Sequence, residues 1–146
     1  ANKNVHVFGN TFDKNQTTHV LIYGYSFDFD DDRYNPLPRD FVIRDNTYGE
    51  GGNDPQGLLA PLAPALGGKL PPIVWDGVNK YGDKTEDVRI VVREKPEVGF
   101  ISLGLVSTPP DLTKAKPSMD RQPDAQIQEP APVVLPEKAA AAKEGA

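Results

Sequence analysis

Acidic residues gather at one point of the sequence, where Asp28 is followed by Asp30, Asp31 and Asp32. Carboxylate oxygens are the ligands that calcium and other hard cations prefer, so this run is a weak candidate for a metal site. It lacks the D-x-[DN]-x-[DN]-G spacing of a calcium loop. We therefore predict neither a metal nor any other cofactor. We interpret the run as a solvated strand end whose like charges oppose edge-to-edge pairing.

One alternative gives the acidic run a function. A calcium-assisted carbohydrate-binding β module would use Asp30, Asp31 and Asp32 together with the aromatic side chains of Tyr25 and Tyr34. This hypothesis predicts that calcium raises the melting temperature, because a ligand that binds only the folded chain stabilises it. It stays open as the first alternative function.

Catalytic motifs are missing from the sequence. His6 and His19 are the only histidines, and there is no cysteine. We find no nucleophile elbow, no phosphate-binding glycine loop and no H-E-x-x-H pair. The sequence therefore predicts a protein that is not an enzyme. A hydrolase whose carboxylates the sequence does not single out is the second alternative.

The charge and hydropathy of the chain narrow the choice of partners. The 146 residues carry a formal net charge of −5, which argues against nucleic acid, because its backbone requires a clustered basic surface. No apolar run is long enough for a membrane span, so we predict no membrane partner. A cytoplasmic or secreted soluble protein fits this composition.

The elements that would position such side chains are strands. From Thr17 to Asp32 the residues alternate, and a period of two is typical of a strand with one face in a core. One face carries Leu21, Tyr23 and Tyr25. We expect this stretch to be the long central strand, with its aromatic face inward.

Five shorter apolar runs also have strand character, and 15 prolines and 13 glycines disfavour long helices. We find no internal repeat among them. The sequence therefore predicts an all-β fold, a small sandwich or barrel of about six strands. The five further strands are expected at Val5–Phe8, Phe41–Arg44, Ile73–Trp75, Val88–Arg93 and Phe100–Val106.

The C-terminal part differs from the rest in composition. Residues 107–146 contain no aromatic residue and seven prolines. Such a segment buries too little apolar surface to offset the entropy of ordering it. We therefore predict a β domain at residues 1–106 and an extended or disordered Pro/Ala-rich arm at residues 107–146.

Apolar residues in irregular stretches are the candidates for binding a partner protein. Residues 58–72 are rich in leucine and proline, and proline lowers the entropy that an extended segment loses on docking. The tail contains one apolar cluster of three residues. The predicted partner-binding residues are Leu58, Leu59, Leu62, Leu66, Trp75, Val133, Val134 and Leu135.

A short stretch resembles a known family. Gly68-Lys69-Leu70 followed by Trp75-Asp76-Gly77 is similar to a stretch of phage capsid decoration (head-stabilising) proteins of the lambda type, from which Pro71 and Pro72 depart as insertions. The resemblance implies a small β-rich fold without catalysis. It also implies a homo-oligomer, usually a trimer, that binds a lattice such as a major capsid protein.

The leading hypothesis combines these features. We expect a non-enzymatic virion structural protein, a capsid decoration or accessory protein, that binds a protein lattice through its β domain and its extended arm. The carbohydrate-binding module and the hydrolase are the two alternatives.

Overall fold

The computed structural model describes residues 1–25, 30–105 and 111–136. Its regular structure is mainly β, with three short 3-10 helices, and this confirms the predicted β character. The strands are β1 (Lys3–Phe8), β2 (Thr11–Phe12), β3 (Val20–Ile22), β4 (Arg39–Arg44), β5 (Thr47–Tyr48), β6 (Ile73–Trp75), β7 (Lys80–Tyr81), β8 (Lys84–Thr85), β9 (Ile90–Arg93) and β10 (Phe100–Ser102). The helices are η1 (Gly57–Leu62), η2 (Pro64–Leu66) and η3 (Leu112–Lys114).

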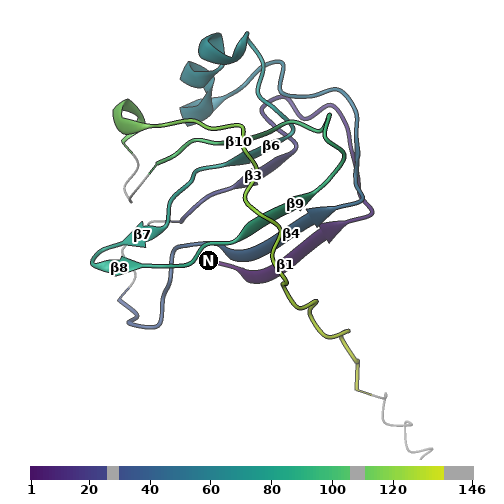
Figure 1. Cartoon of the computed structure of the whole chain (residues 1–146), viewed down its shortest axis with the longest axis vertical. Coiled ribbons are helices and arrows are strands. Elements are labelled where there is room, and N and C mark those ends of the chain that lie inside the picture. The colour runs from purple at the N-terminus through teal and green to yellow at the C-terminus, as the bar shows by residue number, and fades with distance from the viewer. Residues whose placement is uncertain (26–29, 106–110, 137–146) are drawn as a thin grey trace, which may run out of the picture.

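The strands form three coils that stack on one another, as in a short parallel β-solenoid (Figure 1). The first coil contains β1, β2 and β3, the second β4, β5 and β6, and the third β9 and β10. Equivalent strands pair in parallel, in the orders β1-β4-β9, β2-β5 and β10-β6-β3. Only the small hairpin of β7 and β8 is antiparallel among the described strands. The sheets are open, so the predicted sandwich or barrel is not confirmed.

The first two coils repeat a short sequence that our sequence analysis missed. Thr11 pairs with Thr47 and Phe12 with Tyr48, so Asn10-Thr11-Phe12 lies beside Asn46-Thr47-Tyr48 at an offset of 36 residues. The residue before each asparagine, Gly9 or Asp45, has a positive φ and turns the chain at the same corner of the coil. The prediction that the chain has no internal repeat was therefore wrong.

The second coil carries an insertion that hides this repeat. The offset between paired residues is 36 at Thr11 and Thr47 but 53 at Val20 and Ile73. The additional 17 residues lie between β5 and β6, where the chain forms η1 and η2. The leucine- and proline-rich stretch of the sequence is therefore an excursion from the coil.

The predicted long central strand is wrong. Only Val20–Ile22 forms a strand within the described part of Thr17–Asp32, and β3 lies at a sheet edge while β6 is central. Residues 26–29 lie outside the described residues. The strand ends because the N–H of Gly24 donates to the carboxylate of Asp76, and the N–H of Tyr25 donates to the carbonyl of Pro36.

The face that we assigned to the core is also wrong. Leu21, Tyr23 and Tyr25 are 42%, 52% and 44% exposed, whereas Ile22 is buried. Both faces of this stretch are apolar, so the alternation alone did not distinguish them. The face of the strand that carries Ile22 points into the interior of the coil.

The shorter strands agree better with the sequence. Ile73–Trp75 is β6 and Val5–Phe8 falls in β1, as predicted, and β1 lies at a sheet edge. β4 begins two residues earlier than expected, whereas β9 begins at Ile90 and β10 ends at Ser102. Their side chains fill one main apolar core, which includes Ile43, Ile73, Ile90, Phe100 and Ile101.

Part of the predicted arm lies against the β body. Ser118 forms an antiparallel bridge with Ser102 of β10, and Ile127 is buried in a small cluster with Val42 and Val91. Residues 111–127 therefore contribute contacts to the same structural unit as the three coils. The domain boundary at residue 106 stays a prediction, and truncation of the chain tests it.

Candidate functional site

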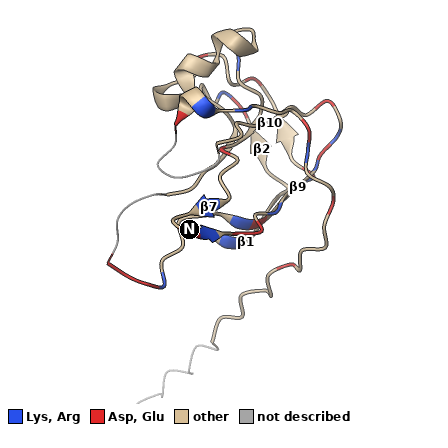
Figure 2. Ribbon diagram, turned by 60° about the vertical axis from the view of Figure 1, so that its left-hand side comes forward, with Lys and Arg blue, Asp and Glu red and all other residues tan. Residues whose placement is uncertain are grey.

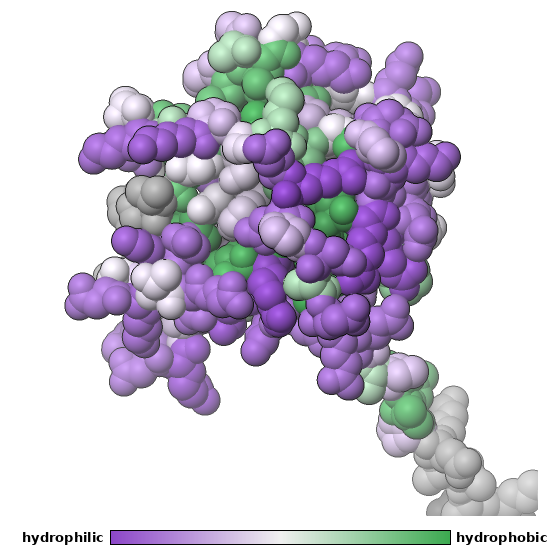
Figure 3. All heavy atoms as spheres, viewed as in Figure 1, coloured by the Kyte–Doolittle hydropathy of each residue, from purple (hydrophilic) through white to green (hydrophobic). Residues whose placement is uncertain are grey.

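An apolar groove of about 320 Å³ lies where the insertion of the second coil meets the ends of β3 and β6. It collects residues that are far apart in the sequence, from η1, η3 and the segment after β10. Figure 3 shows hydrophobic residues gathered at the top of the molecule, where η1 and η2 lie. The main apolar side chains of the groove are Leu21, Tyr23, Leu58, Leu59, Leu105 and Leu112.

The groove has a buried floor and an exposed rim. Leu59 and Leu105 are almost fully buried, whereas Leu58 is 72% exposed. Leu21 and Tyr23 add two further exposed apolar side chains to the lining. The helical turns η1 and η2 carry no charged residue (Figure 2). Exposed apolar side chains that converge on a concave surface are typical of a protein-binding site.

The predicted partner-binding residues of the body divide into two groups. Leu58 and Leu59 line the groove. Leu62 and Leu66 are partly buried and pack against the main core, so they fix η1 and η2 to the body. Trp75 lies in the core at 7% exposure because β6 is the middle strand of its sheet, and its indole Nε1 has no partner among the described residues.

Sequence reasoning missed the rest of the lining. Leu103 and Leu105 follow β10, and Leu112 belongs to η3, in the segment that we had assigned to the arm. Leu21 and Tyr23 had been placed in the core. A strand with one solvated face carries polar residues on that face, whereas both faces of residues 20–25 are apolar. This pattern was the signal in the sequence from which the exposed apolar face could have been found.

The predicted tail residues are the most exposed of the large hydrophobic residues that the structure describes. Val133 and Val134 are each 87% exposed, and Leu135 is 78% exposed. The segment leaves the body at the lower right of Figure 1, whereas η1 and η3 lie at the top. The three side chains therefore lie far from the groove of their own molecule.

The groove contains one carboxylate, that of Asp76, which is buried. Its two oxygens accept hydrogen bonds from the N–H groups of Gly24 (2.6 Å) and Val78 (2.9 Å). Burial raises the pKa of Asp76, and the two backbone hydrogen bonds offset part of the rise. The carboxylate holds the end of β3 against the end of β6 and has no catalytic partner among the residues that line the groove.

Asp76 should make the stability of the chain depend on pH. Because its pKa is raised by folding, its contribution is complete below the unfolded pKa and is lost as the pH rises through the folded pKa. We expect the wild type to lose stability relative to Asp76→Asn between about pH 3 and pH 7. Urea midpoints measured across this range test the prediction. Parallel pH profiles of the two proteins would contradict it.

The acidic run does not form a metal site within the described residues. Asp31 makes two hydrogen bonds with the guanidinium of Arg33, and these bonds lower the pKa of the aspartate. Asp28 lies outside the described residues. No group of three or more histidine, aspartate or glutamate side chains that could hold a metal ion occurs in the described chain.

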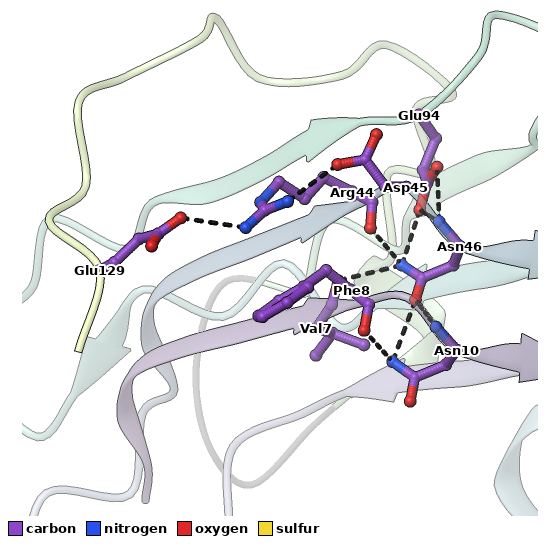
Figure 4. Close-up of polar contacts among 8 residues, drawn as sticks. All are labelled: Val7, Phe8, Asn10, Arg44, Asp45, Asn46, Glu94 and Glu129. Carbon is purple, nitrogen blue, oxygen red and sulfur yellow. Dashed lines mark hydrogen bonds and ion pairs between the residues drawn. The ribbon is translucent and has the colours of Figure 1, made fainter. Parts of the chain in front are cut away.

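A polar ladder runs through the corner of the coils (Figure 4). The side-chain Oδ1 of Asn46 accepts hydrogen bonds from the backbone N–H and the Nδ2 of Asn10, both at 3.0 Å. Nδ2 of Asn46 donates to the carbonyls of Val7 (3.0 Å) and Arg44 (2.9 Å) and to Glu94 Oε1 (2.8 Å). One asparagine side chain thereby joins all three coils.

The ladder has an aromatic neighbour on the adjacent strands. The rings of Phe12 and Tyr48 stack at 5.6 Å between centroids, and the hydroxyl of Tyr48 donates to Glu94 Oε1 at 3.0 Å. Burial, followed by the hydrogen bond to Glu94, raises the pKa of Tyr48. The tyrosine therefore stays protonated as a donor. These contacts give the ladder a structural role in holding the coils in register.

Comparisons with protein-family models, with curated proteins and with solved structures found no match to this chain. Within the described residues, no helix combines the length and the hydropathy that crossing a membrane requires.

Proposed function

We propose that the chain is a non-enzymatic assembly protein that binds an extended apolar segment of another protein molecule in its groove. The observation that carries the proposal is the convergence of exposed Leu21, Tyr23 and Leu58 on a concave apolar surface. Full burial of an exposed side chain of this kind contributes about 1.5–3 kcal/mol. Leu21, Tyr23 and Leu58 are 42%, 52% and 72% exposed, so each offers about half of that gain or more to a partner that covers the groove.

The tail of a second copy is the occupant that the chain itself supplies. Val133, Val134 and Leu135 are exposed, apolar and extended, and flanking prolines restrict their backbone before binding. Because this segment leaves the body far from its own groove, it would reach the groove of a neighbouring molecule (Figure 1). Exchange of tails would produce the homo-oligomer that the sequence predicts.

The experiment is a binding titration with a labelled peptide of residues 129–136. We expect a dissociation constant between about micromolar and millimolar, because three buried side chains must offset the entropy of association. Leu58→Asp should weaken binding at least about tenfold, because it places a charge in the apolar groove. Fluorescence anisotropy measures both values.

Met119→Asp is the matched control, because Met119 is also exposed (65%) and apolar but does not line the groove. The Met119→Asp variant should bind the peptide with the same affinity as the wild type. Equal weakening by both variants would contradict a specific role of the groove. Absence of binding to the wild type would remove the tail as occupant.

The finer assignment, a virion accessory protein that binds a capsid lattice, belongs to the same proposal and rests on the sequence resemblance. A capsid or tail gene beside the gene for this chain would support it. A neighbourhood without virion genes would leave only the general assembly role.

A further inference from the structure

The two ends of the coil stack differ, and the end at the third coil is covered by the C-terminal segment. Gln122 binds the edge of β9: its Oε1 accepts from the N–H of Ile90 (2.8 Å), and its Nε2 donates to the carbonyl of Val88 (3.2 Å). Ser118 exchanges two backbone hydrogen bonds of 2.8 Å with Ser102 on β10. The C-terminal segment therefore contacts the outer strand of each three-stranded sheet at this end.

Arg121 completes this cover. Its guanidinium donates to the carbonyls of Glu94 (2.7 Å), Lys95 (2.8 Å) and Val98 (2.7 Å), in the turn that links β9 to β10. A stack of repeats requires such a terminal cover, because an uncovered last repeat exposes strand edges and part of its apolar face.

The end at the first coil has no such cover in the described chain. β1, β2 and β3 each pair with a strand on one side only. Side chains in one row become more exposed towards this end: Ile101 is 1% exposed and Val74 is 0% exposed, whereas Leu21 is 42% exposed.

The hydrogen bonds of the asparagine ladder indicate which chemical group the open end can bind. Asn46 uses its Oδ1 to accept the backbone N–H of Asn10 from the first coil, and its Nδ2 donates both to Val7 of the first coil and to Glu94 of the third coil. Asn10 donates in the same manner to Phe8 and Asn46, but its Oδ1 accepts no hydrogen bond within the described residues. Figure 4 shows that oxygen pointing away from Asn46. A strand placed one spacing beyond β1, about 4.8 Å away, would bring a backbone N–H to it.

A second copy of this chain does not fit the open end. Two copies that meet by their first coils with their cores on the same side would pair β1 antiparallel to β1, which breaks the donor-to-acceptor direction of the ladder. Contact of a first coil with the third coil of another copy is blocked, because Gln122 and Ser118 occupy that edge.

We propose that the open end formed by β1, β2 and β3 binds a further coil of parallel β-solenoid, contributed by polypeptide other than these 146 residues. Its strand pairs in parallel with β1, and a backbone N–H at its corner donates to Oδ1 of Asn10. The open end shares Leu21 of β3 with the groove, but its pairing contacts would be made by the backbone of β1 and by Asn10, so the inference does not depend on the proposed function.

The probe for the experiment is a copy of the chain's own first coil. Residues 3–38 are duplicated ahead of Lys3, so that the added copy can stack on β1. We expect hydrogen exchange of the β1 amides to slow at least about tenfold and the melting temperature to rise, because an edge strand becomes an internal one. Asn10→Ala in the original coil should remove part of this gain in the tandem protein.

Two outcomes would overturn the proposal. The first is that hydrogen exchange of the β1 amides is the same in the tandem protein as in the parent chain, and is also unchanged when the parent chain is mixed with a peptide of residues 2–13 at millimolar concentration. The second is a concentration-dependent dimer of the parent chain that protects the same amides, which would assign the open end to a second copy. Sedimentation equilibrium combined with hydrogen exchange distinguishes these outcomes.

Discussion

Removal of residues 111–146 is expected to lower the free energy of unfolding by at least about 5 kcal/mol, which matches the whole stability of many small domains. Three sources contribute to this loss. Arg121 and Gln122 together make five hydrogen bonds to the backbone of the third coil. Each contributes about 1 kcal/mol net, and those from a charged group contribute more.

Loss of apolar burial adds to this effect. Ile127 is 9% exposed and covers Val42 and Val91, which are 0% and 1% exposed. Truncation would expose this outer face of β4 and β9, at a cost of about 1.5–3 kcal/mol for each side chain that becomes fully exposed. The salt bridge of Arg93 with Asp124 is exposed on one side and adds at most about 1 kcal/mol.

The matched control is removal of residues 130–136 together with all that follow. This shorter truncation keeps Glu129 and every described contact before it, and should change the stability by less than about 0.5 kcal/mol. Urea unfolding followed by circular dichroism measures both variants. Equal stability of the two truncated chains would contradict the cover and would instead support a domain that ends at residue 106.

Asn46→Ala is expected to be the most destabilising single substitution at the coil corner, at about 3 kcal/mol. The side chain accepts two hydrogen bonds from Asn10 and donates to Val7, Arg44 and Glu94. Alanine leaves those groups without their partner, and an unsatisfied buried polar group costs about 1–3 kcal/mol. Solvent reaches part of this corner, so we place the loss well below the sum of five bonds.

Asn10→Ala is the matched comparison, because Asn10 occupies the same position in the first coil. It has a coil on one side only and should cost about 1 kcal/mol. Asn46→Asp tests the direction of the donors, because an aspartate beside Glu94 replaces an attraction with a repulsion between carboxylates. Its loss should shrink as the pH falls and the carboxylates become protonated. Equal effects of the two alanine variants would mean that the ladder does not join three coils.

The sequence allowed prediction of the β character and of several strands, because an apolar run bounded by Pro72 and Asp76-Gly77 has few other interpretations. It did not allow prediction of the parallel stack. Parallel strands pair across long connections, so no turn residue marks which strands are partners. The matching Asn10-Thr11-Phe12 and Asn46-Thr47-Tyr48 triplets carried that information, but they are short, and the insertion breaks the period after them.

Only part of the groove could be predicted from the sequence. Leu58 lies in a leucine-rich run that no regular helix accommodates, so its exposure followed from local sequence. Leu112 and Leu105 reach the same groove only because the C-terminal segment folds back over the body. A contact of that kind depends on the whole fold, and no pattern in one segment of the sequence encodes it.

The stacking of equivalent strands also has a consequence for how the chain reaches its structure. Paired residues such as Phe41 and Ile90, or Val20 and Ile73, are about fifty positions apart, and among the described strands only β7 and β8 form a local hairpin. Long loops must close before such pairs gain any energy, so we expect folding on the scale of milliseconds to seconds. During that time β6 has no neighbour on either side. Its sequence Ile73-Val74-Trp75 is then the part of the chain most open to intermolecular aggregation.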